Sequence, residues 1–242
     1  MPDSAEFVAT TNGWLGRLGA LLDLGGPVVM LLMAMSVVAL AIIVLKLWQF
    51  ASLRLGDTRF TEQAIAALAA GDRAEALAML GAARNPIARV MEAAVHGRSD
   101  QRLSESLVRE EVARIGARYL EPLRSHLRGL EVIGTLSPLL GLLGTVLGMI
   151  EAFRRLQEAG SRVDPALLSG GIWEALLTTA VGLAVAIPVV AALTWLERRI
   201  DRFRHEMEDA VTQVFTRVPD IAAADVDHLP TPLRQKRRAD AY

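Results

Sequence analysis

The sequence predicts an all-α membrane protein with three transmembrane helices and long helical extensions into a cytoplasmic helical domain. Charged residues are absent from three windows, residues 24–45, 132–150 and 175–196, which are 22, 19 and 22 residues long. A helix needs about 20 apolar residues to cross a hydrocarbon core of roughly 30 Å. Because buried helices of soluble proteins rarely run that far without a charge, each window predicts one membrane span.

Composition excludes several other classes of protein. The formal net charge of −1 argues against a general nucleic-acid binder. The chain has no cysteine, which excludes disulfides, thiol chemistry and zinc–thiolate sites. The first apolar window is too long for a signal peptide, and Asp3, Glu6 and Asp23 precede it where a basic flank would be expected. We therefore expect this window to remain in the mature protein as an anchor.

The first half of the chain alternates between apolar and charged stretches. Residues 1–23 form a short N-terminal segment, and Gly25-Gly-Pro27 opens the first span, with proline in the first helical turn. Lys46, Trp48 and Arg54 end this span as a cation and aromatic pairing typical of a membrane interface.

A cytoplasmic helical domain is predicted over residues 46–131. Residues 60–80 read as two helices around a tight turn at Gly71-Asp72, and Asn85-Pro86 breaks the pattern. A long helix is expected from about residue 101 to the second span, bent by Pro122.

The second half is predicted to contain the other two spans and their flanks. A connector over residues 151–174 joins the spans, a helix follows over 197–218, and a disordered tail occupies 219–242. Most basic residues lie in the large loop and after the third span. The positive-inside rule therefore places the N-terminus and the connector outside, and the 46–131 domain and the C-terminus inside.

Small residues gather on one face of each of the last two spans. At 100° per residue, a stripe about 80° wide on the second span contains Gly134, Pro138, Gly141, Thr145 and Gly148. The comparable stripe on the third span has Glu174 at one edge and Thr179 at the other, and contains Gly171, Ala175, Thr178, Gly182 and Ala186. Small stripes let helices approach closely in lipid, so helix packing is one explanation of both.

Three threonines offer a second explanation. Thr145, Thr178 and Thr179 should lie at nearly the same depth, roughly 7 Å below the outer surface at 1.5 Å of rise per residue. A ring of hydroxyls in an oligomer could hold water or pass protons, because each hydroxyl donates and accepts. A threonine can equally bond to a carbonyl of its own helix, so both explanations stay open.

Glu174 could attract cations at the mouth of such a path, although a glutamate that only reaches into interfacial water is an equal alternative. None of the three spans contains an ionisable residue. A proton pathway would therefore need a carboxylate from a second protein.

Catalysis is not expected. The four histidines, His96, His126, His205 and His228, show no metal-ligand spacing, so we expect no metal site. The spacing of Gly141, Gly144 and Gly148 misses both the dinucleotide-binding and the phosphate-loop patterns. We therefore expect neither a cofactor nor an enzyme.

Two motifs carry a family resemblance. PLLGLLGTVLGMIEAF, from Pro138 to Phe153, and GIWEALLTTAVGLAVAIP, from Gly171 to Pro188, resemble the MotA/TolQ/ExbB proton channel family. Three spans with a cytoplasmic domain between the first two are similar to its TolQ/ExbB branch, whereas MotA-type stators have four spans. The sequence leaves open a TolQ-like or an ExbB-like member and coupling to protons or sodium ions.

The resemblance implies a homopentamer in the bacterial inner membrane. This pentamer would enclose the helices of an ExbD- or TolR-like single-span partner that brings a membrane aspartate. Proton-motive force would be converted into motion and passed to a TonB- or TolA-like periplasmic protein. By motif position, Thr145 and Thr179 match pore-facing threonines and Glu174 matches the family's glutamate. Thr178 stands where some members have alanine, and Leu147 where tryptophan is common.

The alternative is a non-conducting scaffold. In that case the small stripes only pack helices, and the cytoplasmic helices recruit partner proteins.

Overall fold

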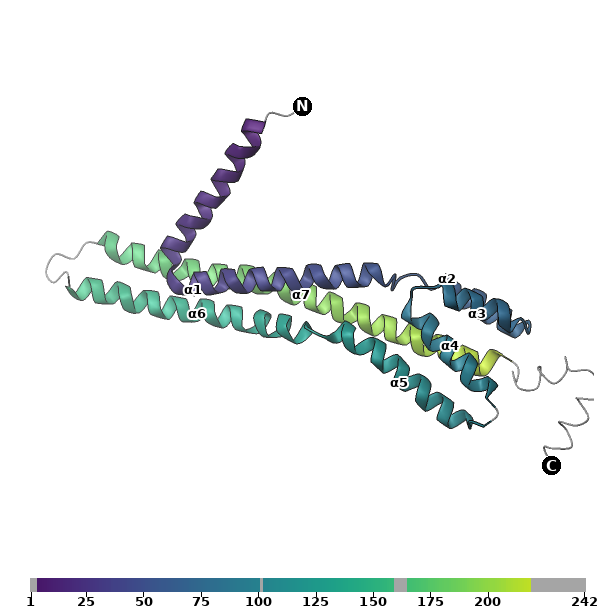
Figure 1. The fold of residues 1–242 in the computed structure, drawn as a ribbon. Coiled ribbons are helices and arrows are strands. Elements are labelled where there is room, and N and C mark those ends of the chain that lie inside the picture. Colours follow the sequence, from purple (N-terminus) through teal and green to yellow (C-terminus); the bar gives the residue numbers. More distant parts are fainter. Residues whose placement is uncertain (1–3, 101, 159–164, 219–242) are drawn as a thin grey trace, which may run out of the picture. The chain divides into compact units, whose positions relative to one another are not determined.

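Over the described residues, 4–100, 102–158 and 165–218 of a computed structural model, the chain forms seven α-helices (Figure 1). The helices are α1 (Ser4–Ser52), α2 (Arg59–Ala69), α3 (Arg73–Ala82), α4 (Pro86–Ser99), α5 (Glu105–Arg124), α6 (Leu127–Glu158) and α7 (Pro165–Arg217). Three helical stretches are long and apolar enough to cross a membrane: Gly26–Ser52, Glu105–Glu158 and Leu168–Arg217. The predicted fold class, an all-α membrane protein, is confirmed.

The chain divides into two compact units. The first unit consists of residues 1–45 and 126–195, and the second unit of residues 46–125 and 196–242. Helices α1 and α7 each contribute residues to both units. The predicted tail, 219–242, lies outside the described residues, so its disorder stays a prediction.

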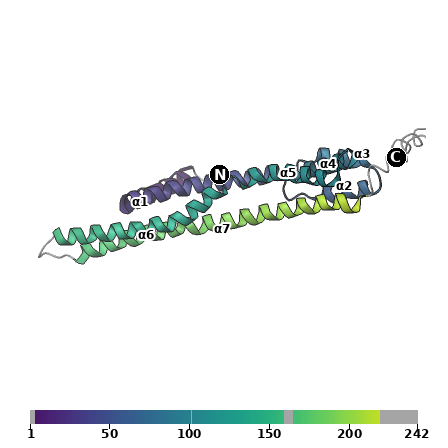
Figure 2. The ribbon, with the colours of Figure 1, turned by 90° about the horizontal axis from the view of Figure 1, so that it is seen from below.

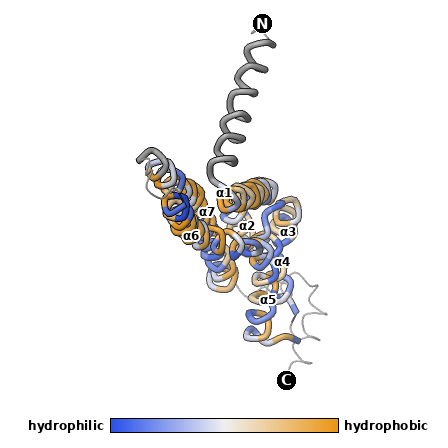
Figure 3. The backbone as a smooth tube through the Cα atoms, turned by 90° about the vertical axis from the view of Figure 1, so that its left-hand side faces the viewer, coloured by the Kyte–Doolittle hydropathy of each residue, from blue (hydrophilic) through white to orange (hydrophobic). Residues whose placement is uncertain are grey.

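In the first unit, α1 has a kink where the sequence places the start of the first span. Gly26 adopts φ 59° and ψ −162°, a conformation that side-chain-bearing residues rarely adopt, and Pro27 follows as a compatible first-turn residue. Helices α6 and α7 run side by side in opposite directions (Figures 1 and 2). Apolar residues predominate along the part of α1 that follows the kink and along α6 and α7, and hydrophilic residues recur along α3 and α5 (Figure 3).

The predicted connector, 151–174, is helical at both ends. Helix α6 continues to Glu158, and α7 already begins at Pro165. Arg154 and Arg155 support the extension of α6 through ion pairs to Glu151, with N–O distances of 2.8 and 3.0 Å. Such pairs three and four residues apart stabilise a helix by tenths of a kcal/mol each.

In the second unit, the predicted turn at Gly71-Asp72 is present between α2 and α3. Gly71 has φ 86°, which only glycine adopts without strain. The Asp72 carboxylate caps α3 by accepting from the Glu75 amide at 2.9 Å.

Helix α4 begins at the Asn85-Pro86 pair, where the sequence indicates only a break. Pro86 occupies the first turn, and the Asn85 side chain accepts from the Ile87 amide at 3.0 Å. The side-chain nitrogen of Asn85 donates to the Arg54 and Asp57 carbonyls at 3.2 and 3.0 Å. One asparagine therefore ties the start of α4 to the chain that follows α1.

The long helix predicted from residue 101 to the second span is instead two helices. Helix α5 starts at Glu105 after the N-cap Ser104 and ends at Arg124, in the turn that contains Pro122. Ser125 is extended and His126 has φ 65°, so the helix cannot continue through them. Helix α6 then begins at Leu127.

Lys46 differs from its expected place at the membrane interface. Its side chain is 1% exposed, and its ammonium donates to the Pro122 and Leu123 carbonyls at 2.9 and 3.1 Å. The neighbouring Trp48 is 70% exposed, as expected for an interfacial aromatic residue.

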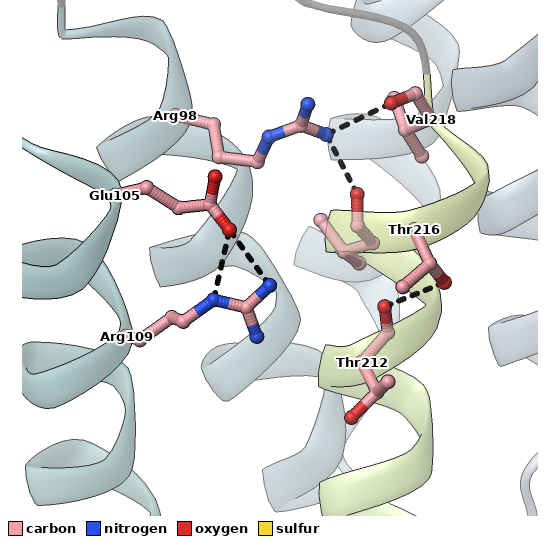
Figure 4. Close-up of polar contacts among 7 residues, drawn as sticks. Arg98, Glu105, Arg109, Thr212, Thr216 and Val218 are labelled. Atoms are coloured by element: carbon pink, nitrogen blue, oxygen red, sulfur yellow. Dashed lines mark hydrogen bonds and ion pairs between the residues drawn. The ribbon is translucent and has the colours of Figure 1, made fainter.

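Arg98 bonds to the end of α7, and Arg109 bonds to Glu105 of its own helix (Figure 4). Arg98 donates to the Val214 and Val218 carbonyls at 2.7 and 3.1 Å, which satisfies carbonyls that lack helical partners. The Arg109 guanidinium lies 4.1 Å from the centroid of the Phe215 ring. Both contacts lie at the last turn of α7, which ends at Arg217, one residue before the predicted end of the helix over residues 197–218.

We predict that Asn85→Ala destabilises the start of α4 by about 3 kcal/mol, because the buried Asn85 side chain would no longer bond to two backbone carbonyls or cap the helix. The measurement is the local opening free energy from hydrogen exchange of the α4 amides. Asp72→Ala is the matched control, since it removes an exposed cap worth about 1 kcal/mol. Equal effects at the two sites would contradict the role of Asn85.

Candidate functional site

The closest helix contact in the first unit joins α6 and α7. Gly141 and Gly182 approach so closely that a Cβ built on Gly182 would lie 2.6 Å from the Ser137 carbonyl oxygen and 3.1 Å from the Gly141 Cα. A Cβ built on Gly141 would lie 3.1 Å from the Thr178 carbonyl oxygen. Because these neighbours are backbone atoms, no side-chain rotation could relieve the overlap.

The contact continues along both helices in antiparallel register. A Cβ on Gly134 would lie 2.8 Å from Val190, one on Gly148 2.9 Å from the Ala175 Cβ, and one on Gly171 2.5 Å from the Ala152 Cβ. Ala175 and Ala186 are buried as well. The predicted small residues of α7 and most of those of α6 therefore lie in one interface.

The contact face of α6 is rotated from the predicted stripe by roughly 50°, taking 100° per residue. Its buried residues include Ser137 and Gly144, which the predicted set lacks. Pro138 and Thr145 lie at its margin and are half-buried. The signal for Gly144 was its position three residues after Gly141 and four before Gly148.

Thr178 lies inside this contact and is 4% exposed. Its hydroxyl donates to the Ala175 carbonyl at 2.7 Å and lies 3.3 Å from the Gly141 carbonyl. A Cβ on Gly144 would lie 2.5 Å from the Thr178 hydroxyl oxygen. Thr178 thus packs the two helices together.

Thr145 and Thr179 lie at the margins of the contact. The Thr179 hydroxyl donates across the interface to the Gly141 carbonyl at 3.1 Å, and the Thr145 hydroxyl donates to the Leu142 carbonyl at 2.7 Å. Thr145 also lines an open cavity of about 690 Å³ along α6, together with Val146, Met149, Ile150, Phe153, Arg154 and Gln157. The side chain of Thr145 is therefore only partly covered by other residues of the chain.

Glu174 does not lie on the side of the helix pair where the Thr145 and Thr179 hydroxyls lie. It is half-buried, and on a helical wheel it lies at the margin of the α7 face opposite to Thr179. Glu151, just beyond the second span, is engaged by Arg154 and Arg155 through hydrogen bonds of 2.9 and 3.0 Å. Among the described residues, no group of three or more histidine, aspartate or glutamate side chains could hold a metal ion.

Comparison with known proteins assigns this arrangement to a family. A model of the MotA/TolQ/ExbB proton channel family matches residues 82–209, which is more than half of the chain and includes the whole α6–α7 contact. The chain belongs to this family. The family comprises proton-channel and transport components, and the three apolar stretches agree with a multi-pass membrane protein.

Individual relatives agree with the TolQ/ExbB branch. The chain is 43% identical over 90 residues to biopolymer transport protein exbB1 of Vibrio cholerae, covering 37% of this chain and 40% of that protein. It is 32% identical over 164 residues to biopolymer transport protein ExbB of Salmonella typhimurium, covering 67% and 64%. It is 33% identical over 99 residues to the Tol-Pal system protein TolQ of Haemophilus influenzae, covering 41% and 43%. The chain thus spans less than two thirds of the length of each of these relatives.

We predict that Gly182→Ala weakens the α6–α7 contact by about 1–3 kcal/mol, because the added methyl group meets a carbonyl oxygen that cannot move aside. The measurement is the midpoint of thermal unfolding of the purified protein in detergent. Gly170→Ala on the same helix is the control, since a Cβ there meets no atom within 4 Å. If both variants unfold at the wild-type temperature, the close approach is not a constraint.

Proposed function

We propose that the chain is an ion-conducting subunit of a TolQ–TolR or ExbB–ExbD type complex in the bacterial inner membrane. In this proposal a homopentamer encloses the helices of a single-span partner with a membrane aspartate. Proton-motive force is converted into mechanical work on a TonB- or TolA-like periplasmic protein, for outer-membrane transport or envelope integrity.

The observation that carries this proposal is that the three threonines occupy different positions relative to the helix contact. Thr178 is buried in the helix contact, whereas Thr145 and Thr179 lie at its margins. Both marginal residues are offset from the contact line by roughly 70° in the same rotational sense. In an antiparallel helix pair, two residues that are rotated from the contact line by the same angle in the same sense lie on the same side of the pair. Two hydroxyls therefore flank one side of the α6–α7 pair, where another chain can meet them.

The absence of charge in the spans supports the need for a partner. Residues 132–150 and 175–196 contain hydroxyls but no group that can store a proton. A carboxylate in the hydrocarbon region is costly unless polar groups surround it. The hydroxyls of Thr145 and Thr179 suit that role when a partner helix brings an aspartate to their level.

Large apolar side chains on the spans agree with burial in lipid or against other subunits. Leu142, Ile150 and Ile187 are 58%, 60% and 67% exposed in the single chain. The proposed orientation, with the N-terminus periplasmic and the C-terminus cytoplasmic, rests on the basic residues beyond the third span, including Arg198, Arg199, Arg202 and Arg204.

The scaffold remains the second candidate because of one specific observation. The hydroxyls of Thr145, Thr178 and Thr179 all donate to backbone carbonyls of α6 or α7. A purely structural role would need nothing more from them.

The first test is co-expression with the neighbouring single-span reading frame, followed by native mass spectrometry of the purified complex. The proposal requires a pentamer that contains a partner with an aspartate in its membrane helix. A stable assembly without such a partner would favour the scaffold.

We predict that Thr145→Val and Thr179→Val each reduce proton flux per complex at least tenfold in proteoliposomes while the complex still assembles. Valine keeps the shape of threonine and removes the hydroxyl that would contact the partner's carboxylate. Thr194→Val is the matched control, because Thr194 is exposed on the same span and donates to the Val190 carbonyl of its own helix.

Wild-type flux in both variants would exclude a hydroxyl pathway at Thr145 and Thr179. Thr178→Val separates packing from conduction. Since its hydroxyl lies within the helix contact, we expect lower thermal stability with flux per assembled complex retained.

A further inference from the structure

Lys46 is among the largest fully buried side chains of the described chain, although it carries a charge. Its ammonium nitrogen lies 2.9 Å from the Pro122 carbonyl oxygen and 3.1 Å from that of Leu123. It also donates to the Gln49 side-chain oxygen at 3.0 Å and to the Ser125 hydroxyl at 3.3 Å. All four of these acceptors are neutral, so the contact is a set of charge-assisted hydrogen bonds and not an ion pair.

The two carbonyls lose their helical donors because α5 stops beside them. The Ser125 hydroxyl donates to the Pro122 carbonyl at 2.7 Å, whereas Lys46 donates to both the Pro122 and the Leu123 carbonyls. In a continuous α-helix, the carbonyls of residues 122 and 123 would accept from the amides of residues 126 and 127. The extended Ser125 and the φ of 65° at His126 turn the chain out of that path. The ammonium of Lys46 occupies the place of the helical donors, and its positive charge is favourable at the C-terminal end of a helix.

A lysine at the end of a membrane span usually has its ammonium in water and not among backbone carbonyls. At the end of a membrane span, lysine normally extends its ammonium to the interface while its methylene groups stay in apolar surroundings. Removing an ammonium from water is costly unless hydrogen bonds replace its hydration. The inward position of Lys46 therefore indicates that the α5 carbonyls hold it strongly.

We propose that Lys46 is a positioning residue whose ammonium, supplied from α1, caps the C-terminus of α5 and fixes the helix break at Ser125–His126. Helix α6 takes its starting point, Leu127, from this break. The same helix carries Thr145 and the glycines of the α6–α7 contact, so the proposed site lies on the helix that starts at this break. The effect on coupled work rests on the proposed function, whereas the cap itself does not.

The test compares Lys46→Met, Lys46→Arg and the control Arg128→Met in the full-length protein with its partner in lipid nanodiscs. Methionine matches the lysine stem without a donor, and arginine keeps charge and donors. Arg128 is exposed and lies close to the same break, so its substitution removes one charge without the cap. Hydrogen exchange with mass spectrometry is followed over residues 123–127.

We predict that Lys46→Met changes exchange of these amides at least tenfold, while Lys46→Arg and Arg128→Met stay within threefold of wild type. Faster exchange would mean that the last turn of α5, held by the Ser125 amide on the Glu121 carbonyl at 3.0 Å, frays. Slower exchange would mean that α5 continues into α6. Either change supports the cap, and wild-type exchange in Lys46→Met overturns it.

Coupled work per complex gives the second readout. We expect the proton-driven work per complex to fall at least tenfold in Lys46→Met and to stay at half of the wild-type value or more in Lys46→Arg. The amount of assembled complex should be equal in all variants. If Lys46→Met does not assemble, rescue of assembly by Lys46→Arg supports the cap, and failure of both variants overturns it. If the wild-type complex performs no proton-dependent work, the proposed function fails while the exchange data still decide the role of Lys46.

Discussion

The close approach of the α6 and α7 backbones at Gly141 and Gly182 is the constraint on which the first unit depends. Lipid chains are as apolar as leucine, so two membrane helices gain little from burying leucine against each other. They gain from short-range packing, which requires positions without a Cβ. The 2.6 Å separation between a Cβ built on Gly182 and the Ser137 oxygen shows that this packing leaves no space for even a methyl group.

This packing also determines what remains for chemistry. One face of each helix is filled by the contact, including the Thr178 hydroxyl, so among the three threonines only those at the margins can face another chain. Thr145 and Thr179 are such residues, and they lie on the same side of the pair. Because a hydroxyl donates and accepts but does not store a proton at neutral pH, the proposed pathway needs an acid from a partner at the level of these hydroxyls. Glu174 lies at the opposite margin of α7, and its part in the pathway stays a prediction.

Local signals in the sequence were sufficient for much of the fold. Charge-free windows located the spans, and Gly71-Asp72 located a turn because glycine at positive φ and an aspartate cap act locally. Gly171, Ala175, Thr178 and Gly182 of the α7 stripe lie against α6, as helix spacing alone predicts. The rotation of α6 was missed because Gly144 and Thr145 are neighbours in sequence, and only the position of α7 decides which of them is covered. The break at His126 has no glycine to mark it, and the acceptors of Lys46 are 76 and 77 residues away in the chain.

Backbone carbonyl groups accept hydrogen bonds from side chains of other helices both at the α6–α7 contact and at the break between α5 and α6. Where backbones approach at Gly141, a hydroxyl of α7 donates to the carbonyl, and where α5 ends, an ammonium of α1 donates to two. Each bond ties a side chain to the backbone of another helix. At Gly141, which lies within a span, sliding or rotation would break the bond without a replacement donor from water. The glycine contact adds a steric limit in the same direction. We therefore expect α6 and α7 to move as one hairpin, so that motion driven by ion flow occurs between this hairpin and the helix of a partner, along the side where Thr145 and Thr179 lie.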